Sequence, residues 1–125
     1  MIAFNRDEVT SRESSPAGYH PVYNSVLCGI DLQTGSTWFA VNCATGDFCF
    51  LTNFRTPANY NQRGKRYGSR GHLVLEYVKI HDPTITDKKY ASVEEYEKAL
   101  VDTDTRGFNI VYGNALSGLI RYYQF

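Results

Sequence analysis

The 125-residue sequence lacks three features that often assign a protein to a class: net charge, a long hydrophobic run and a dense set of cysteines. Its 13 Lys and Arg balance its 13 Asp and Glu. A neutral chain has no general attraction for nucleic acid, so we expect no nucleic-acid partner. No stretch approaches the roughly 18 to 20 apolar residues that cross a bilayer, and the first residues do not resemble a secretory signal. The sequence therefore predicts a soluble chain without a transmembrane segment.

Cysteine is scarce. Cys28, Cys43 and Cys49 form an odd set with no CxxC pair and no histidine at zinc-ligand spacing. This pattern argues against a disulfide framework and against a structural zinc site. We expect three free thiols, a reducing compartment and no metal site.

The composition is that of a folded protein. Hydrophobic residues make up 42% of the chain, charged residues 21%, and 10 Tyr, 7 Phe and 1 Trp can supply much of a core. The length suits one domain, so residues 1–125 are interpreted as a single domain or half-domain.

Two hairpins are predicted from turn residues between β-rich runs. Residues 36–53 form two such runs around Thr45-Gly46, and residues 108–125 form two more around a turn within 114–118. If the first loop has two residues, Cys43 and Cys49 lie on opposite faces of the sheet; another loop length would change that.

Two amphipathic helices are predicted between the hairpins. One begins after Ser69 as N-cap and stops at Asp82-Pro83; the other begins at a capping box of Ser92 and Glu95 and ends near Val101. Strands at both ends with helices between them indicate an α+β domain in which the helices cover a sheet.

A basic segment lies between the hairpins. No carboxylate occurs between Asp47 and Glu76, and five basic residues fall in that interval: Arg55, Arg63, Lys65, Arg66 and Arg70. The segment is either a solvated loop or a site for a small anionic ligand.

Both ends of the predicted sheet look open. The first apolar run, Ile2–Phe4, is too short for a regular central strand, and the last run exposes an aromatic edge at Tyr122, Tyr123 and Phe125. We expect self-association through such an edge.

Six short motifs follow one another along the chain. They are NRDEVTSR (5–12), GID (29–31), GSTW (35–38), LTNFR (51–55), SRGHLV (69–74) and GFN (107–109). In this order and spacing they resemble the NRDE-motif family, known for transport and Golgi organisation. The resemblance implies an N-terminal-nucleophile-hydrolase-like fold, in which helix layers enclose two sheets, with this chain as an incomplete, N-terminal half.

The resemblance also bears on activity. Family members usually carry a cysteine where this chain has Ile2, and that cysteine would be the nucleophile by analogy with amide hydrolases of this fold. We therefore expect a catalytically incomplete protein with no catalytic residue, linked to secretory-pathway and Golgi organisation and to haem or lipid handling. The rival hypothesis is a cysteine-dependent amide hydrolase whose nucleophile is missing from this chain start.

Residues of the motifs are candidates for binding a ligand or structuring a site. They are Asn5, Arg6, Asp7, Glu8, Arg12, Asp31, Trp38, Asn53, Arg70 and Asn109. For Arg6 with Asp7 or Glu8 we favour a structural ion pair over an orienting role, and for Trp38 a place in the core. Asn53 and Asn109 have amides that suit either a ligand or unpaired backbone groups.

The family's link to haem makes haem the one cofactor to consider. His72, near Tyr67 and Tyr77 in the sequence, is the candidate axial ligand, although no CxxCH or paired-histidine motif supports it. The expected location is the cytoplasm, with association with the Golgi or the mitochondrion.

Overall fold

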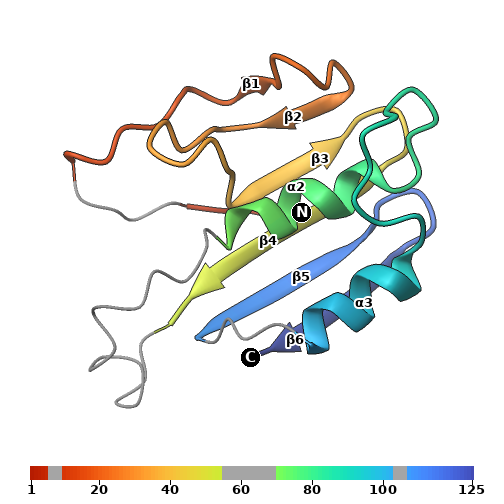
Figure 1. Ribbon diagram of the computed structural model, residues 1–125. Coiled ribbons are helices and arrows are strands. Elements are labelled where there is room, and N and C mark those ends of the chain that lie inside the picture. The colour runs from red at the N-terminus through yellow and green to blue at the C-terminus, as the bar shows by residue number, and fades with distance from the viewer. Residues whose placement is uncertain (6–9, 55–69, 103–106) are drawn as a thin grey trace.

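The computed structural model describes residues 1–5, 10–54, 70–102 and 107–125. The elements, in chain order, are β1 (Gly18–Tyr19), β2 (Val26–Cys28), β3 (Phe39–Asn42), β4 (Asp47–Asn53), α2 (Gly71–Lys79), α3 (Val93–Val101), β5 (Phe108–Asn114) and β6 (Leu119–Gln124). The strands form one antiparallel sheet in the order β1-β2-β3-β4-β5-β6 (Figure 1). The predicted α+β class is confirmed.

Both predicted hairpins are present, and one loop differs from the two-residue case considered above. β3 pairs with β4 through Val41 and Phe48, and the Gly46 N–H donates to the Asn42 carbonyl, so the loop spans residues 43–46. Gly46 has a φ of 79°, which suits glycine. Cys43 lies exposed in this loop and Cys49 is buried in β4, and both are free thiols, as is Cys28.

The two helices form where the sequence predicts them, with one error at an N-terminus. α3 begins after Ser92, whose Oγ accepts from the Glu95 N–H at 3.3 Å, which confirms the predicted cap. The residue preceding α2 is Arg70, with no side-chain cap, so Ser69 is not its N-cap. α2 ends at Lys79, three residues before Asp82.

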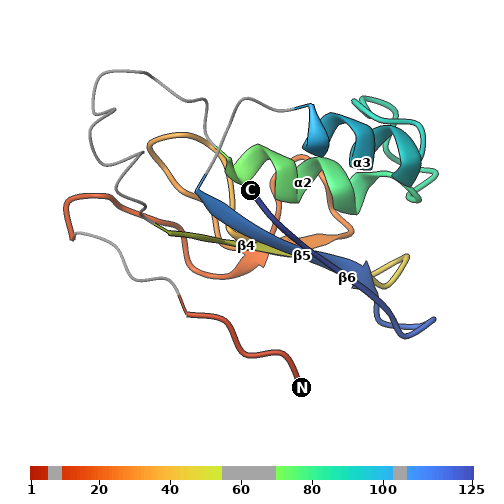
Figure 2. The same cartoon turned by 90° about the horizontal axis from the view of Figure 1, so that it is seen from below.

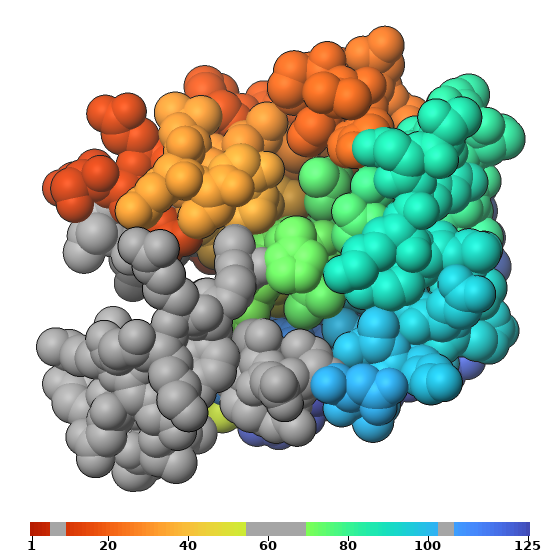
Figure 3. Space-filling view, in the orientation of Figure 1, coloured from red at the N-terminus to blue at the C-terminus, as the bar shows by residue number. Residues whose placement is uncertain are grey.

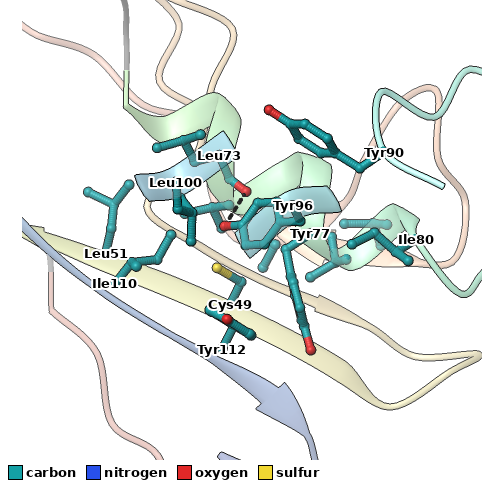
Figure 4. Close-up of a cluster of buried hydrophobic side chains, with 14 of the residues drawn as sticks. Cys49, Leu51, Leu73, Tyr77, Ile80, Tyr90, Tyr96, Leu100, Ile110 and Tyr112 are labelled. Atoms are coloured by element: carbon teal, nitrogen blue, oxygen red, sulfur yellow. Dashed lines mark hydrogen bonds between the residues drawn. The ribbon is translucent and has the colours of Figure 1, made fainter. Parts of the chain in front are cut away.

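The core lies between the helices and one face of the sheet. Three tyrosines, Tyr77, Tyr96 and Tyr112, are almost fully buried there, with ring centroids 4.5 to 5.5 Å apart. Burial of such rings contributes about 1.5 to 3 kcal/mol each. The Tyr96 hydroxyl donates to the Leu73 carbonyl at 3.1 Å, so it is satisfied within the core (Figure 4). In the space-filling view, α2 is enclosed between the segments before β3 and the region of α3 (Figure 3).

The opposite face of the sheet carries no helix among the described residues (Figure 2). The strand residues that point to this open face follow from the register: Tyr19, Leu27, Phe39, Val41, Phe48, Phe50, Thr52, Asn109, Val111, Gly113, Ile120, Tyr122 and Gln124. None is charged. The apolar run Ile2–Phe4 forms no strand. Phe4 instead lies over Phe39 and Phe50, and its ring centroid is 5.8 Å and 5.9 Å from theirs.

The edges are only partly as expected. Tyr122 is exposed on β6, whereas Tyr123 and Phe125 pack against the core. None of the described helices is long and apolar enough to span a membrane.

Candidate functional site

Residues from four of the motifs meet at one end of the sheet, which we call the motif end. It comprises Asp31, residues 36–38, residues 70–71 and residues 107–108, where β3 and β5 begin and β4 ends (Figure 1). A Cβ on Gly71 would lie 2.5 Å from Ser36 Oγ and 2.6 Å from the Thr37 carbonyl oxygen. Only glycine therefore lets α2 begin so close to the GSTW segment.

A tight loop sets the position of Asp31. The Asp31 N–H donates to the Ser36 carbonyl and the Asp31 carbonyl accepts from the Gly35 N–H, both at 2.7 Å. Gly35 has a φ of 68°, a conformation that glycine adopts without strain. The loop buries the Asp31 side chain completely.

Arg12 pairs with this carboxylate. Its Nε donates to Asp31 Oδ2 at 2.8 Å and its Nη2 donates to the same oxygen, while Oδ1 accepts from the Gln33 N–H at 3.0 Å. Burial opposes ionisation of Asp31, but these bonds from Arg12 and Gln33 outweigh it and hold its pKa below the ordinary value. A carboxylate held ionised in this way is a poor proton acceptor at neutral pH.

Trp38 completes this group. The Arg12 guanidinium carbon lies 5.7 Å from the Trp38 ring centroid, within cation–π range, and Trp38 packs against the core, as expected. One contact group thus contains Arg12, Asp31 and Trp38, residues that span 26 positions of the sequence.

Arg70 bridges two elements at the same end. Its Nη1 donates to the Gly107 carbonyl at 2.9 Å, linking the start of α2 to the start of β5. Burial lowers the pKa of this guanidinium, which nonetheless stays charged at neutral pH. The basic residues with which Arg70 was grouped, Arg55 to Arg66, lie outside the described residues.

Asn109 belongs to the other side of the sheet. Its Nδ2 donates to Thr52 Oγ1 at 3.1 Å and its Oδ1 accepts from the Tyr122 hydroxyl at 2.9 Å, so its amide connects β4, β5 and β6 on the open face. Asn53 is exposed at the end of β4. Neither asparagine joins the Arg12–Asp31 pair.

The remaining candidates cannot be placed in this group. Asn5 is exposed, and Arg6, Asp7 and Glu8 lie outside the described residues. His72, the candidate axial ligand, is exposed on α2, whereas Tyr77 of the same helix is buried and Tyr67 lies outside the described residues. Across the described ranges, no group of three His, Cys, Asp or Glu side chains could hold a metal ion.

Sequence reasoning missed a polar cluster at the other end of β4. Asp47 is completely buried and accepts from Thr45 Oγ1 at 2.7 Å and Asn114 Nδ2 at 3.0 Å, and its Oδ2 lies 3.0 Å from His81 Nδ1. The hydrogen bond to Asp47 fixes the imidazole, whose side chain is 52% exposed. Asp47 follows a turn glycine and His81 follows a helix, so nothing in local spacing relates them.

A second missed network centres on Asp82. Its Oδ2 accepts from Asn42 Nδ2 at 2.9 Å and from Ser25 Oγ, and its Oδ1 accepts from Thr84 Oγ1 at 2.6 Å. Burial opposes ionisation, and the bonds from Ser25, Thr84 and Asn42 overcome it and lower the Asp82 pKa. The only sequence signal was Asp82-Pro83, which we interpreted as a helix stop.

Two of the three thiols are buried. Burial raises the pKa of Cys49, in the core, and of Cys28, where a hydrogen bond involving Thr37 partly opposes the shift. A raised pKa keeps a thiol protonated and unreactive at neutral pH. Cys43, the exposed thiol, lies in the β3–β4 loop at the opposite end of β4 from the motif end.

Comparison with known proteins relates the chain to one family. Residues 1–124 match the family described as Transport and Golgi organisation 2. The chain is 28% identical to the human Transport and Golgi organization protein 2 homolog over 130 aligned residues, covering 98% of this chain and 42% of the relative. It is 32% identical to the bovine homolog over 98 residues, covering 75% of this chain and 33% of the relative.

The chain therefore spans less than half the length of these curated relatives. No solved structure matches the chain. The family match covers nearly the whole sequence and includes all the motif segments that build the motif end. This chain belongs to the Transport and Golgi organisation 2 family.

Proposed function

We propose that this chain is a non-catalytic family member that binds an apolar ligand, either haem or lipid, as part of a role in transport and Golgi organisation. The observation that carries the ligand class is the open face, whose strand residues include no charge. An uncharged sheet face with exposed apolar side chains is a surface that needs an apolar partner. Its aromatic trio of Phe4, Phe39 and Phe50 lies toward the motif end.

The motif residues support a binding role over a catalytic one. Arg12 and Asp31 bond to each other, Arg70 bonds to a backbone carbonyl, and Asn109 bonds to side chains on neighbouring strands. Each of these bonds holds parts of the fold together. The thiols with raised pKa values are buried away from solvent, which does not favour a nucleophile.

The same surface supports an N-terminal-nucleophile-hydrolase-like architecture. In a sandwich of two sheets, one face of each sheet packs on helices and the other packs on the second sheet, so both faces are apolar. The face under α2 and α3 and the open face both have this character. The ligand would then enter beside the aromatic trio, at the margin of the covering layer.

Haem would bind here without a histidine from this surface. His72 lies on α2, which covers the opposite face, and His81 is held by Asp47 beyond the same helix. Neither of these two histidines therefore lies on the open face. Haem and fatty acids share an extended apolar body and a carboxylate, and that shared chemistry is what we expect the protein to recognise.

Ligand binding can be tested by titrating the purified chain with hemin and, separately, with a long-chain fatty acid. Phe50→Asp should weaken binding of both by roughly tenfold or more, because it places a charge in the aromatic trio. Leu116→Asp, at an 81% exposed leucine in the β5–β6 turn, is the matched control and should bind normally. Loss of hemin binding in His72→Ala, or normal binding in Phe50→Asp, would reject this site.

The catalytic question has a separate test. The rival hypothesis of a cysteine-dependent amide hydrolase has its nucleophile missing from this chain start, whereas turnover of acyl-amide substrates that disappears when Cys28, Cys43 or Cys49 becomes serine would contradict the non-catalytic proposal itself. We expect no turnover above background by the wild-type chain. Fractionation of cells expressing the protein tests the proposed cytoplasmic location with Golgi or mitochondrial association.

A further inference from the structure

β6 forms one edge of the described sheet. β6 is the last strand of the sheet, and within the described part of the chain no segment pairs with its outer side. Its register with β5 runs without a bulge from Asn109↔Gln124 to Asn114↔Leu119, and it contains no proline. Natural proteins usually shorten, charge or interrupt such edges, because free backbone groups recruit another strand.

The other edge of the same sheet has this protection. β1 has only two residues, Gly18–Tyr19, and prolines at positions 16 and 21 flank it. Proline cannot donate a backbone hydrogen bond and rarely lies inside a paired strand. The contrast leaves β6 as the edge at which the sheet can grow.

The backbone groups available on β6 follow from its pairing with β5. Phe108 and Phe125 exchange hydrogen bonds, at 3.3 and 3.0 Å. Because hydrogen-bonded pairs alternate along an antiparallel ladder, Tyr123, Arg121 and Leu119 direct their N–H and C=O groups to β5. The groups of Ile120, Tyr122 and Gln124 therefore point outward.

We propose that this edge pairs antiparallel with β6 of a second copy, with the two-fold axis at Tyr122. Tyr122 then faces Tyr122 of the second copy, and Ile120 faces Gln124 in each direction. All three outward residues of both strands are paired, which gives about six hydrogen bonds between chains, since each hydrogen-bonded pair exchanges two. The result is a continuous antiparallel sheet through both copies.

The charge pattern selects this register among the possible pairings of β6 with β6 of a second copy. Arg121 is the only charged residue of β6, and its Nε lies 3.3 Å from Glu97 Oε1 of its own chain. In the proposed register Arg121 faces Tyr123 of the second copy. A register centred on Arg121 would oppose two arginines, which is unfavourable, and one centred on Tyr123 would leave Ile120 facing no strand residue.

Charges introduced at Tyr122, on the two-fold axis, test the pairing. The dimer is measured by sedimentation equilibrium over the micromolar range. Tyr122→Lys and Tyr122→Glu should each raise the dimer dissociation constant by roughly tenfold, because like charges then face each other. An equimolar mixture of the two variants should restore dimers, since Lys then faces Glu. The Tyr122 side chain is 58% exposed, so either charge is compatible with the folded monomer.

The controls separate edge pairing from other association. Ser117→Lys and Ser117→Glu, in the exposed β5–β6 turn, should dimerise as the wild-type chain does. Ile120→Pro removes an outward N–H from each copy and should also weaken dimers, whereas Ile120→Thr keeps that N–H and should not. A monomeric wild-type chain, dimers unaffected by both Tyr122 charges, or no recovery on mixing would overturn the proposal.

Discussion

Replacing Asp31 by asparagine tests whether the motif end holds the fold together. Asparagine keeps the Oδ1 acceptor for the Gln33 N–H but presents an NH2 group where Oδ2 accepts from Arg12. The Arg12 Nε and Nη2 donors then face another donor. The carboxylate is completely buried, while the Arg12 side chain is 31% exposed and can regain some water.

The size of the effect follows from this geometry. Removing one partner of a fully buried ion pair costs about 3 to 5 kcal/mol, and rehydration of Arg12 reduces that here to about 2 to 3 kcal/mol. For a domain of this length the melting temperature should fall by roughly 8 to 12 °C. Thermal and urea unfolding followed by circular dichroism measure both quantities.

The dependence on pH has a defined sign. Hydrogen bonds hold the native Asp31 pKa below its unfolded value of about 3.9, so the unfolded chain takes up the proton first as pH falls. The stability that Asp31 contributes is therefore complete above about pH 4 and is lost as pH falls through the native pKa. The wild-type and Asp31→Asn melting temperatures should converge in acid.

A matched variant sets the baseline. Asp102→Asn removes a carboxylate from an exposed position after α3 and should change stability by no more than about 0.5 kcal/mol. If Asp31→Asn unfolds like Asp102→Asn at neutral pH, the Arg12–Asp31 pair does not stabilise the fold, and the structural interpretation of these motif residues is wrong.

Three further changes have defined outcomes. Asp82→Asn should destabilise the protein by about 2 to 3 kcal/mol in urea unfolding, because an amide cannot accept from all the donors around this buried position. Gly71→Ala should lower the melting temperature, because its Cβ would lie 2.6 Å from a backbone oxygen. Under native conditions iodoacetamide should modify Cys43 rapidly and Cys49 only after unfolding, as mass spectrometry would show, since burial raises the Cys49 pKa.

Local signals predicted the elements that depend on local physics. The α3 N-terminus follows from Ser92 and Glu95, three residues apart, and the β5–β6 hairpin follows from two β-rich runs around a short turn. The α+β class follows from the order of these elements. Each of these features is decided within a few residues of chain.

The features that sequence reasoning missed depend on distant residues. β1 and β2 have two and three residues, too few to show a period, and they form because β1 pairs with β2 and β2 pairs with β3. The Asn42–Asp82 bond joins residues 40 positions apart, so no spacing rule reveals it. The start of α2 depends on the close approach of Gly71 to the Ser36 loop, a contact between residues 35 positions apart that no local capping signal reveals.

Several of the motif residues make their polar contacts within the fold. An arginine and a carboxylate are useful in an active site when their charges face a substrate. Here the Arg12 and Asp31 charges face each other, and the Arg12 guanidinium lies over the Trp38 ring. The Asn109 amide is likewise engaged at both ends, by Thr52 and Tyr122. Two surfaces of the described chain remain for binding. One is the set of apolar side chains on the open face, and the other is the row of outward backbone groups along β6. Binding at those surfaces requires no proton transfer and no nucleophile, because burial of apolar area and pairing of free backbone groups are its driving forces.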